Sequence, residues 1–358
     1  MKRNHIYPIS LALLAAFLFG ASAPLSKLLL GEIEPILLAA FLYLGSAFGL
    51  LTIKAFQKVG KSTANTEANL KKTDFLWLAG ATLAGGIAAP IVLLFSLRNT
   101  PASTASLLLT FEAVATTLIA ALAFKESVSR RAWWAIVLVT VASMFLSINP
   151  NSGWGFSFGA LGILVACVLW GIDNNLTRNI SAKDPLIIVI VKSFVAGTFS
   201  LALAILAGNQ LPEWNILLGA MILGILSYGL SISLFIRAMR GLGAARTSAL
   251  FGTAPLAGIA LSLIVFHETL NFMFLLAIPL MVAGTIFLVY EQHKHTHIHE
   301  ETVHEHSHSH EDGHHEHPHP ESEISARSHS HLHKHPTDVH EHHHMPDIHH
   351  RHAHLTET

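Results

Sequence analysis

The chain has 358 residues, of which 51% are apolar and only 13% are charged, and its formal net charge is −1 with histidine neutral. This total combines a basic part, with a net charge of +8 over residues 1–290, and an acidic part, with −9 over residues 291–358. The basic part consists mostly of apolar runs long enough to span a bilayer, which excludes a soluble globular protein. The single cysteine, Cys167, excludes a disulfide framework and a thiolate metal site.

Ten apolar segments follow one another along the basic part, separated by short polar connections. Backbone groups in lipid must find their hydrogen bonds within the segment, so each segment is predicted to be a transmembrane helix. We therefore expect an all-α integral membrane protein with a histidine-rich tail. The predicted spans are 8–30, 34–56, 74–97, 101–123, 131–148, 155–178, 184–207, 213–236, 243–266 and 270–290.

The orientation follows from the distribution of Lys and Arg, which are enriched in cytoplasmic connections. With the N-terminus in the cytoplasm, the connections on that side carry 15 Lys or Arg, and those on the other side carry only Arg98. Ten spans return the chain to the side on which it started. We therefore expect a multi-pass protein of the bacterial inner (plasma) membrane with both termini in the cytoplasm.

The membrane part of the sequence repeats itself. Residues 98–127 align with residues 240–269 at a constant offset of 142, without a gap, and "LFGASAPLSK" from Leu18 is similar to "LWGIDNNLTR" from Leu169. Because each half has five helices, an odd number, the second half enters the membrane from the opposite side. Inverted-topology repeats of this kind are common in secondary transporters. The predicted domains are the repeats 8–148 and 155–290 and the tail 291–358.

These motifs resemble the drug/metabolite transporter superfamily, in its ten-helix form with two EamA domains. The resemblance covers about residues 8–290. It rests on an aromatic-glycine pair early in each half, a small-residue segment that opens the fourth helix of each half, and an acidic residue after that helix. It implies transport across a membrane and leaves the substrate open. The matching positions are Phe19-Gly20 and Trp170-Gly171, Pro101–Leu109 and Gly243–Phe251, and Glu126 and Glu268.

Ionisable side chains at membrane depth are costly, which makes them candidates for a transport pathway. Glu112 lies near the middle of the fourth predicted span, Asp173 lies with Asn174 and Asn175 in the sixth, and Lys192 lies in the seventh. We expect Glu112 to bind a proton or another cation, because buried carboxyl groups with altered proton affinity mark functional sites. The alternative is a structural ion pair, for instance with Lys192.

Two further residues belong to this polar set. Trp170 is a candidate for the pathway, with simple packing as the alternative. Lys27 lies close to the outer end of the first predicted span, and we expect its long side chain to reach the membrane–water interface. In the repeat, residues 173–175 fall opposite residues 22–24, which are small and much less polar. The two halves would therefore line a pathway unequally.

The tail holds 24 of the 26 histidines and very few apolar residues. We expect it to be disordered, because it cannot bury a core. Neutral imidazole favours ions such as Zn²⁺, Ni²⁺ and Cu²⁺, and Co²⁺ is a related candidate, so the tail is predicted to hold metal loosely at several sites. The alternative is a solvated, pH-buffering tail with incidental metal affinity. The candidate ligands are His293, His295, His297, His299, His304, His306, His308 and His310.

The sequence favours a secondary transporter that exports small metabolites or drugs by alternating access and carries a metal-responsive tail. Its expected partners are the lipid bilayer, a small-molecule substrate and divalent metal ions, with no nucleic acid and no required cofactor. One alternative is efflux of Ni²⁺, Co²⁺ or Zn²⁺, although no span pairs His with His or Asp at helical spacing. The other is a membrane metal sensor that transports nothing. Neither a nucleotide-binding loop nor a catalytic triad is evident, so we do not expect an enzyme.

Overall fold

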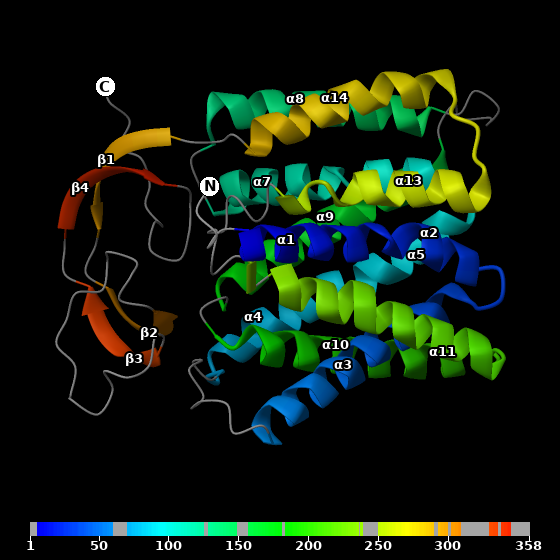
Figure 1. Ribbon diagram of the computed structural model, residues 1–358, viewed down its shortest axis with the longest axis horizontal. Coiled ribbons are helices and arrows are strands. Elements are labelled where there is room, and N and C mark those ends of the chain that lie inside the picture. Colours follow the sequence, from blue (N-terminus) through cyan, green and yellow to red (C-terminus); the bar gives the residue numbers. More distant parts are fainter. Residues whose placement is uncertain are drawn as a thin grey trace.

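The body of the protein is a bundle of long apolar helices (Figure 1). The computed structural model describes residues 6–59, 70–124, 128–148, 157–180, 183–235, 237–238, 250–289, 293–299, 302–308, 329–335 and 338–344. The helices are α1 (Ile6–Gly20), α2 (Ser22–Leu29), α3 (Pro35–Val59), α4 (Asp74–Ala81), η1 (Thr82–Ala88), α5 (Ala89–Arg98), α6 (Ala102–Leu108), α7 (Phe111–Ala123), α8 (Arg130–Ser147), α9 (Phe158–Arg178), α10 (Pro185–Leu206), α11 (Trp214–Leu223), η2 (Gly224–Leu230), α13 (Ala254–Phe266) and α14 (Phe272–Val289).

Within the described residues, eight continuous helical segments are long and apolar enough to cross a membrane. They match the first eight predicted spans, which are thereby confirmed as membrane-length helices. The ninth predicted span, 243–266, lies partly outside the described residues and ends in α13, a shorter apolar helix. The tenth coincides with α14. The eight segments are α1–α2, α3, α4–η1–α5, α6–α7, α8, α9, α10 and the helix that begins with α11 and η2.

Two of these segments contain a π-helical stretch. η1 and η2 are each seven residues long, and they begin 142 residues apart, at Thr82 and Gly224. A π-helix places one extra residue in a turn, and such stretches are rare and are often found at functional sites. The spacing between η1 and η2 equals the offset of the sequence repeat.

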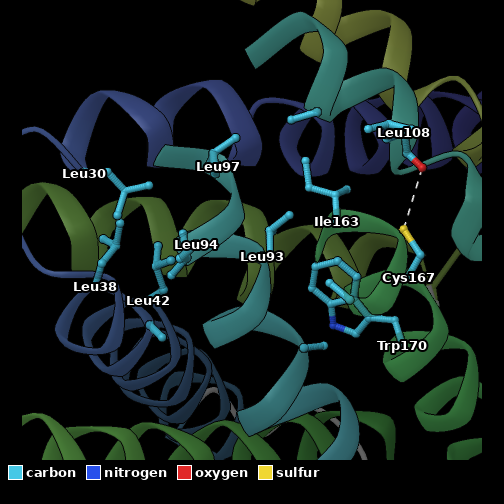
Figure 2. Packing of buried hydrophobic residues seen from close by; sticks show 14 of the residues in the cluster. Leu30, Leu38, Leu42, Leu93, Leu94, Leu97, Leu108, Ile163, Cys167 and Trp170 are labelled. Carbon is cyan, nitrogen blue, oxygen red and sulfur yellow. Dashed lines mark hydrogen bonds between the residues drawn. The ribbon is translucent and has the colours of Figure 1, made fainter. Parts of the chain in front are cut away.

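Helices that are distant in the sequence pack closely against one another. α3 packs along α10 and η2, α9 packs along α5 and α7, and α14 packs along α8. Figure 1 shows α8 and α14 together at one edge of the bundle. Figure 2 shows the leucine-rich core between them, in which the sulfur of Cys167 lies 3.7 Å from the Leu108 carbonyl oxygen. At Gly224, a Cβ atom would overlap the backbone of Leu42. Glycine is therefore needed where the two helix backbones approach.

The outside of the bundle is covered by large apolar side chains. Leu76, Leu122 and Leu206 are each more than three-quarters exposed. Such a surface is expected on helices that face lipid.

Lys27 lies near the end of α2, and its expected position at the membrane–water interface stays a prediction. Its ammonium group donates hydrogen bonds to the carbonyl oxygens of Thr100 and, at 3.3 Å, Leu97. The end of a helix carries free carbonyl groups and the negative end of the helix dipole, and both attract a cation. The C-terminal end of α5 therefore binds this side chain.

Parts of the tail are described as strands, and its expected disorder stays a prediction. Four seven-residue strands lie in it, and they pair in antiparallel fashion as β1 with β4 and β2 with β3. Two-stranded sheets of this kind are marginally stable in water. The strands are β1 (His293–His299), β2 (Thr302–His308), β3 (His329–His335) and β4 (Asp338–His344).

Candidate functional site: an ion pair and a carboxylate among α7, α9 and α10

An ion pair between Asp173 of α9 and Lys192 of α10 lies inside the bundle. The Lys192 ammonium donates to both carboxylate oxygens of Asp173, and the Thr177 hydroxyl donates to one of them at 2.9 Å. The two charged side chains are only 7% and 16% exposed, respectively. Charges removed from water need both an opposite charge and hydrogen bonds, and this arrangement supplies them.

The π-helix η1 lies directly against this ion pair. A Cβ atom at Gly85 would overlap the Asp173 carboxylate, and one at Gly86 would lie 3.7 Å from Cγ of Lys192. Gly85 is therefore required for the approach of the backbone to the carboxylate. This contact accounts for the glycine at position 85 in the middle of an otherwise apolar span.

The carbonyl oxygen of Gly85 accepts two hydrogen bonds from aromatic side chains. The Tyr43 hydroxyl and the Trp170 ring nitrogen both donate to it, each at 3.0 Å. Both side chains are buried, and Figure 2 shows the Trp170 ring among the core leucines. Tyr43, Gly85 and Trp170 thus hold η1 in place beside Asp173.

Glu112 lies in the first turn of α7, which packs against α9, the helix that carries Asp173. Its carboxylate accepts a hydrogen bond from the Asn174 side-chain amide at 2.9 Å, and the same amide group lies 3.1 Å from the Thr116 hydroxyl. Glu112 is half-buried and Asn174 is exposed. The start of a helix favours a negative charge. No ion pair to Glu112 lies within the described part of the chain, and Lys192 binds Asp173 instead.

Asn175 has a structural position between the same two helices. Its amide donates to the backbone carbonyl of Thr116 in α7 at 3.0 Å and to that of Gly171 in its own helix at 2.8 Å. The side chain is buried. Asn175 therefore ties α9 to α7, while Asn174 contacts the Glu112 carboxylate.

The structure thus brings four of the predicted pathway residues into one region, which we call the polar cluster: Glu112, Asp173, Asn174 and Lys192. Asn174, which binds the Glu112 carboxylate, follows Asp173 directly in α9. Tyr43 and Gly85 were not among the pathway residues that the sequence predicted. The adjacent glycines at 85 and 86 were the available signal for Gly85, whereas nothing local marks Tyr43.

The predicted metal ligands of the tail fall in two strands. His293, His295, His297 and His299 belong to β1, and the next three belong to β2, while His310 lies outside the described residues. Among the residues described, no three His, Cys, Asp or Glu side chains form a group that could hold a metal ion. The metal-binding prediction stays a prediction.

Comparison with known proteins identifies the family. The model of the EamA-like transporter family matches this chain twice, over residues 6–148 and 157–290. The chain belongs to the EamA-like transporter family. This confirms the family that the aromatic-glycine pairs and acidic residues indicated.

One relative and one solved structure are similar to this EamA-like chain. An uncharacterized transporter from Methanothermobacter thermautotrophicus is 28% identical over 301 residues, which cover 78% of this chain and 85% of the relative. A solved crystal structure is similar in fold, with a TM-score of 0.57 and 17% sequence identity, and the match covers 78% of this chain and 95% of the other. The family makes this a multi-pass membrane protein that transports a small molecule.

Proposed function

We propose that this protein is a secondary transporter that exports small metabolites or drugs across the bacterial inner membrane by alternating access. Two five-helix repeats of opposite orientation would exchange conformations to open the pathway to either side. The proposal is supported by the two separate family matches. It is also supported by the spacing between η1 and η2, which equals the sequence offset.

The proposed coupling mechanism rests on one observation: the two carboxylates of the polar cluster have partners of different charge. Lys192 neutralises Asp173, whereas the described partner of Glu112 is the neutral amide of Asn174. The cluster therefore has two negative charges and one positive charge when both acids are ionised. Binding of one proton or another monovalent cation at Glu112 would make the polar cluster neutral overall. A neutral cluster can move within a low-dielectric environment at a lower cost in free energy than a charged one.

The substrate and the driving ion can be tested together in cells. Export of amino acids, nucleosides and the ions Ni²⁺, Zn²⁺ and Co²⁺ is measured from cells that express the full chain or Glu112→Gln. Glu32→Gln is the matched control, because that carboxylate is exposed and lies far from the cluster in sequence. We expect Glu112→Gln to lose export against a gradient and Glu32→Gln to keep it. Normal export by Glu112→Gln would remove this residue from the mechanism.

We further propose that the tail binds divalent transition metals and responds to them. The alternation of histidine along the tail supports this role, because imidazole is a common ligand for such metals. A chain that stops after Gln292 separates this role from transport. If truncation leaves metabolite export intact and changes its dependence on metal, the tail is regulatory. Export of metal alone, reduced by truncation, would instead favour the metal-efflux function.

The proposed orientation places both ends of the chain in the cytoplasm, in accord with the excess of Lys and Arg in the connections on that side. A reporter domain that is active only in the cytoplasm, fused after Thr358, tests it. The reporter should be active in intact cells. Activity of a periplasmic reporter at the same position would reverse the orientation.

A further inference from the structure

The junction between α5 and α6, residues 97–103, is bound by two charged side chains of opposite sign. At the end of α5, carbonyl oxygens of Leu97 and Thr100 accept hydrogen bonds from the Lys27 ammonium. At the start of α6, the backbone N–H groups of Ala102 and Ser103 donate to the Glu268 carboxylate at 2.7 and 2.9 Å. A cation thus lies at a helix C-terminus and an anion at a helix N-terminus, the arrangement that the helix dipoles favour.

Glu268 makes the more extensive of the two contacts. Besides the two backbone groups, the Ser103 hydroxyl donates to its carboxylate at 2.5 Å, so three donors converge on one side chain. Hydrogen bonds to an ionised acceptor are about twice as strong as neutral ones. Glu268 follows α13, 165 residues after Ser103, so this contact joins the two regions that match the family model separately.

The backbone next to Glu268 has an uncommon conformation. His267 has φ 51° and ψ 38°, and among the described residues it is the one non-glycine residue with a positive φ. A left-handed conformation is uncommon for such a residue and persists where the surrounding structure fixes it. At His267 it reverses the chain after α13 so that the next side chain reaches the start of α6.

A second, more exposed ion pair lies at the same end of the bundle. The Arg98 guanidinium lies 3.0 Å from the Glu34 carboxylate, but both side chains are more than one-third exposed, at 36% and 50%. Exposed pairs contribute little to stability. The half-buried contacts of Glu268 and Lys27 therefore carry the attachment at this end.

We propose that Glu268 and Lys27 form a latch, which holds this end of the bundle closed and opens when the pathway opens to that side. The inference extends the alternating-access function proposed above. It assigns a role to the acidic residue that follows α13. Opening would require α6 and the end of α5 to leave the two charged side chains, which exposes the interior near α2.

Accessibility of an introduced thiol tests the latch without any substrate. The chain has one cysteine, so Cys167→Ala gives a thiol-free background. Ser26 of α2 is 1% exposed and its hydroxyl has no hydrogen-bond partner, so Ser26→Cys disturbs little and reports on this end. Ser231→Cys is a second buried reporter, placed beside the carbonyl of Ala15 in α1. The purified full chain in lipid nanodiscs is treated with a charged maleimide, which reaches both faces.

We expect Glu268→Gln to raise the labelling rate at Ser26→Cys by about tenfold or more, because several hydrogen bonds to a charged group are weakened. Lys27→Met should act in the same direction. The rate at Ser231→Cys should not rise. Glu213→Gln is the matched control, since Glu213 stands directly before a helix, α11, but its side chain makes no capping hydrogen bond.

Two results would overturn the latch. Unchanged labelling at Ser26→Cys in Glu268→Gln would show that the contact does not restrain opening. A parallel rise at both reporters would show general loosening of the fold. The assay contains no substrate, so its failure is distinguishable from failure of the export experiment with Glu112→Gln.

Discussion

Lys192 and Asp173 are nineteen residues apart on consecutive helices, and the ammonium group of Lys192 binds both carboxylate oxygens of Asp173. η1 covers this pair with the backbone of Gly85 and Gly86. Lys192 is therefore paired with Asp173, and the Glu112 carboxylate accepts a hydrogen bond from the amide of Asn174. This division of roles makes distinct predictions for each member of the polar cluster.

Removal of one partner of the ion pair should lower the free energy of unfolding much more than removal of both partners. We expect Lys192→Met to lower the free energy of unfolding by about 3–5 kcal/mol, because it leaves a buried carboxylate without its counterion. The double variant Asp173→Asn with Lys192→Met should recover most of that loss. Denaturant titration in detergent micelles, followed by tryptophan fluorescence, measures both. A double variant as unstable as the sum of the two single variants would contradict the buried pair.

Gly85 should tolerate no side chain. Gly85→Ala puts a methyl group into the Asp173 carboxylate, and overpacking of this kind costs about 1–3 kcal/mol. Gly229→Ala in η2 is the matched control, since the nearest atoms to its Cβ lie at 3.4–3.5 Å, which is ordinary contact. The melting temperature of the purified protein should fall for Gly85→Ala and hold or rise for Gly229→Ala. Equal behaviour of the two variants would argue against the packing of η1 on Asp173.

The Tyr43 hydroxyl should contribute modestly to stability. Tyr43→Phe removes one of the two donors to the Gly85 carbonyl oxygen, and the Trp170 ring nitrogen remains. We expect a loss of about 1 kcal/mol in the free energy of unfolding. Tyr7→Phe is the comparison, because Tyr7 is 67% exposed, and it should change nothing measurable. The same denaturant titration applies, and a neutral Tyr43→Phe would place the hydroxyl outside the network that holds η1.

Metal binding by the tail should weaken as the pH falls. A histidine binds metal only in its neutral form, so affinity is present above a pKa of about 6.5 and is lost as the pH falls through it. Calorimetric titration of the full chain with Ni²⁺ should show several sites at about pH 7.5 and few at about pH 5.5. A chain stopped after Gln292 should bind little at either pH. Equal binding by the truncated chain would place the metal sites in the helical body.

The first eight membrane spans were predictable because length and apolar character are local properties of the sequence. Glu112, Asp173 and Lys192 were predictable as a set for the same reason, since each is an ionisable group in an apolar run. Their pairing was not predictable, because it depends on how α7, α9 and α10 face one another. An ion pair between Glu112 and Lys192 was one alternative from the sequence. In the structure, Lys192 pairs with Asp173 instead.

The partners of backbone groups were the least predictable part of the site. Lys27 binds carbonyl groups at the end of α5, and Glu268 binds N–H groups at the start of α6. Every residue has such groups, so the sequence does not mark which of them are free. Tyr43 escaped notice for the same reason, because its acceptor is the carbonyl oxygen of a glycine.

The π-helical form of η1 and η2 has a mechanical consequence. Each holds one residue more per turn than an α-helix, and a change to α geometry would rotate the chain beyond it by about 100° relative to the chain before it. In η1 that rotation would carry the Gly85 carbonyl oxygen away from Tyr43 and Trp170, and the backbone away from Asp173. Each of these two long helices thus contains a π-helical segment at mid-length, and the one in η1 contacts Asp173 of the ion pair.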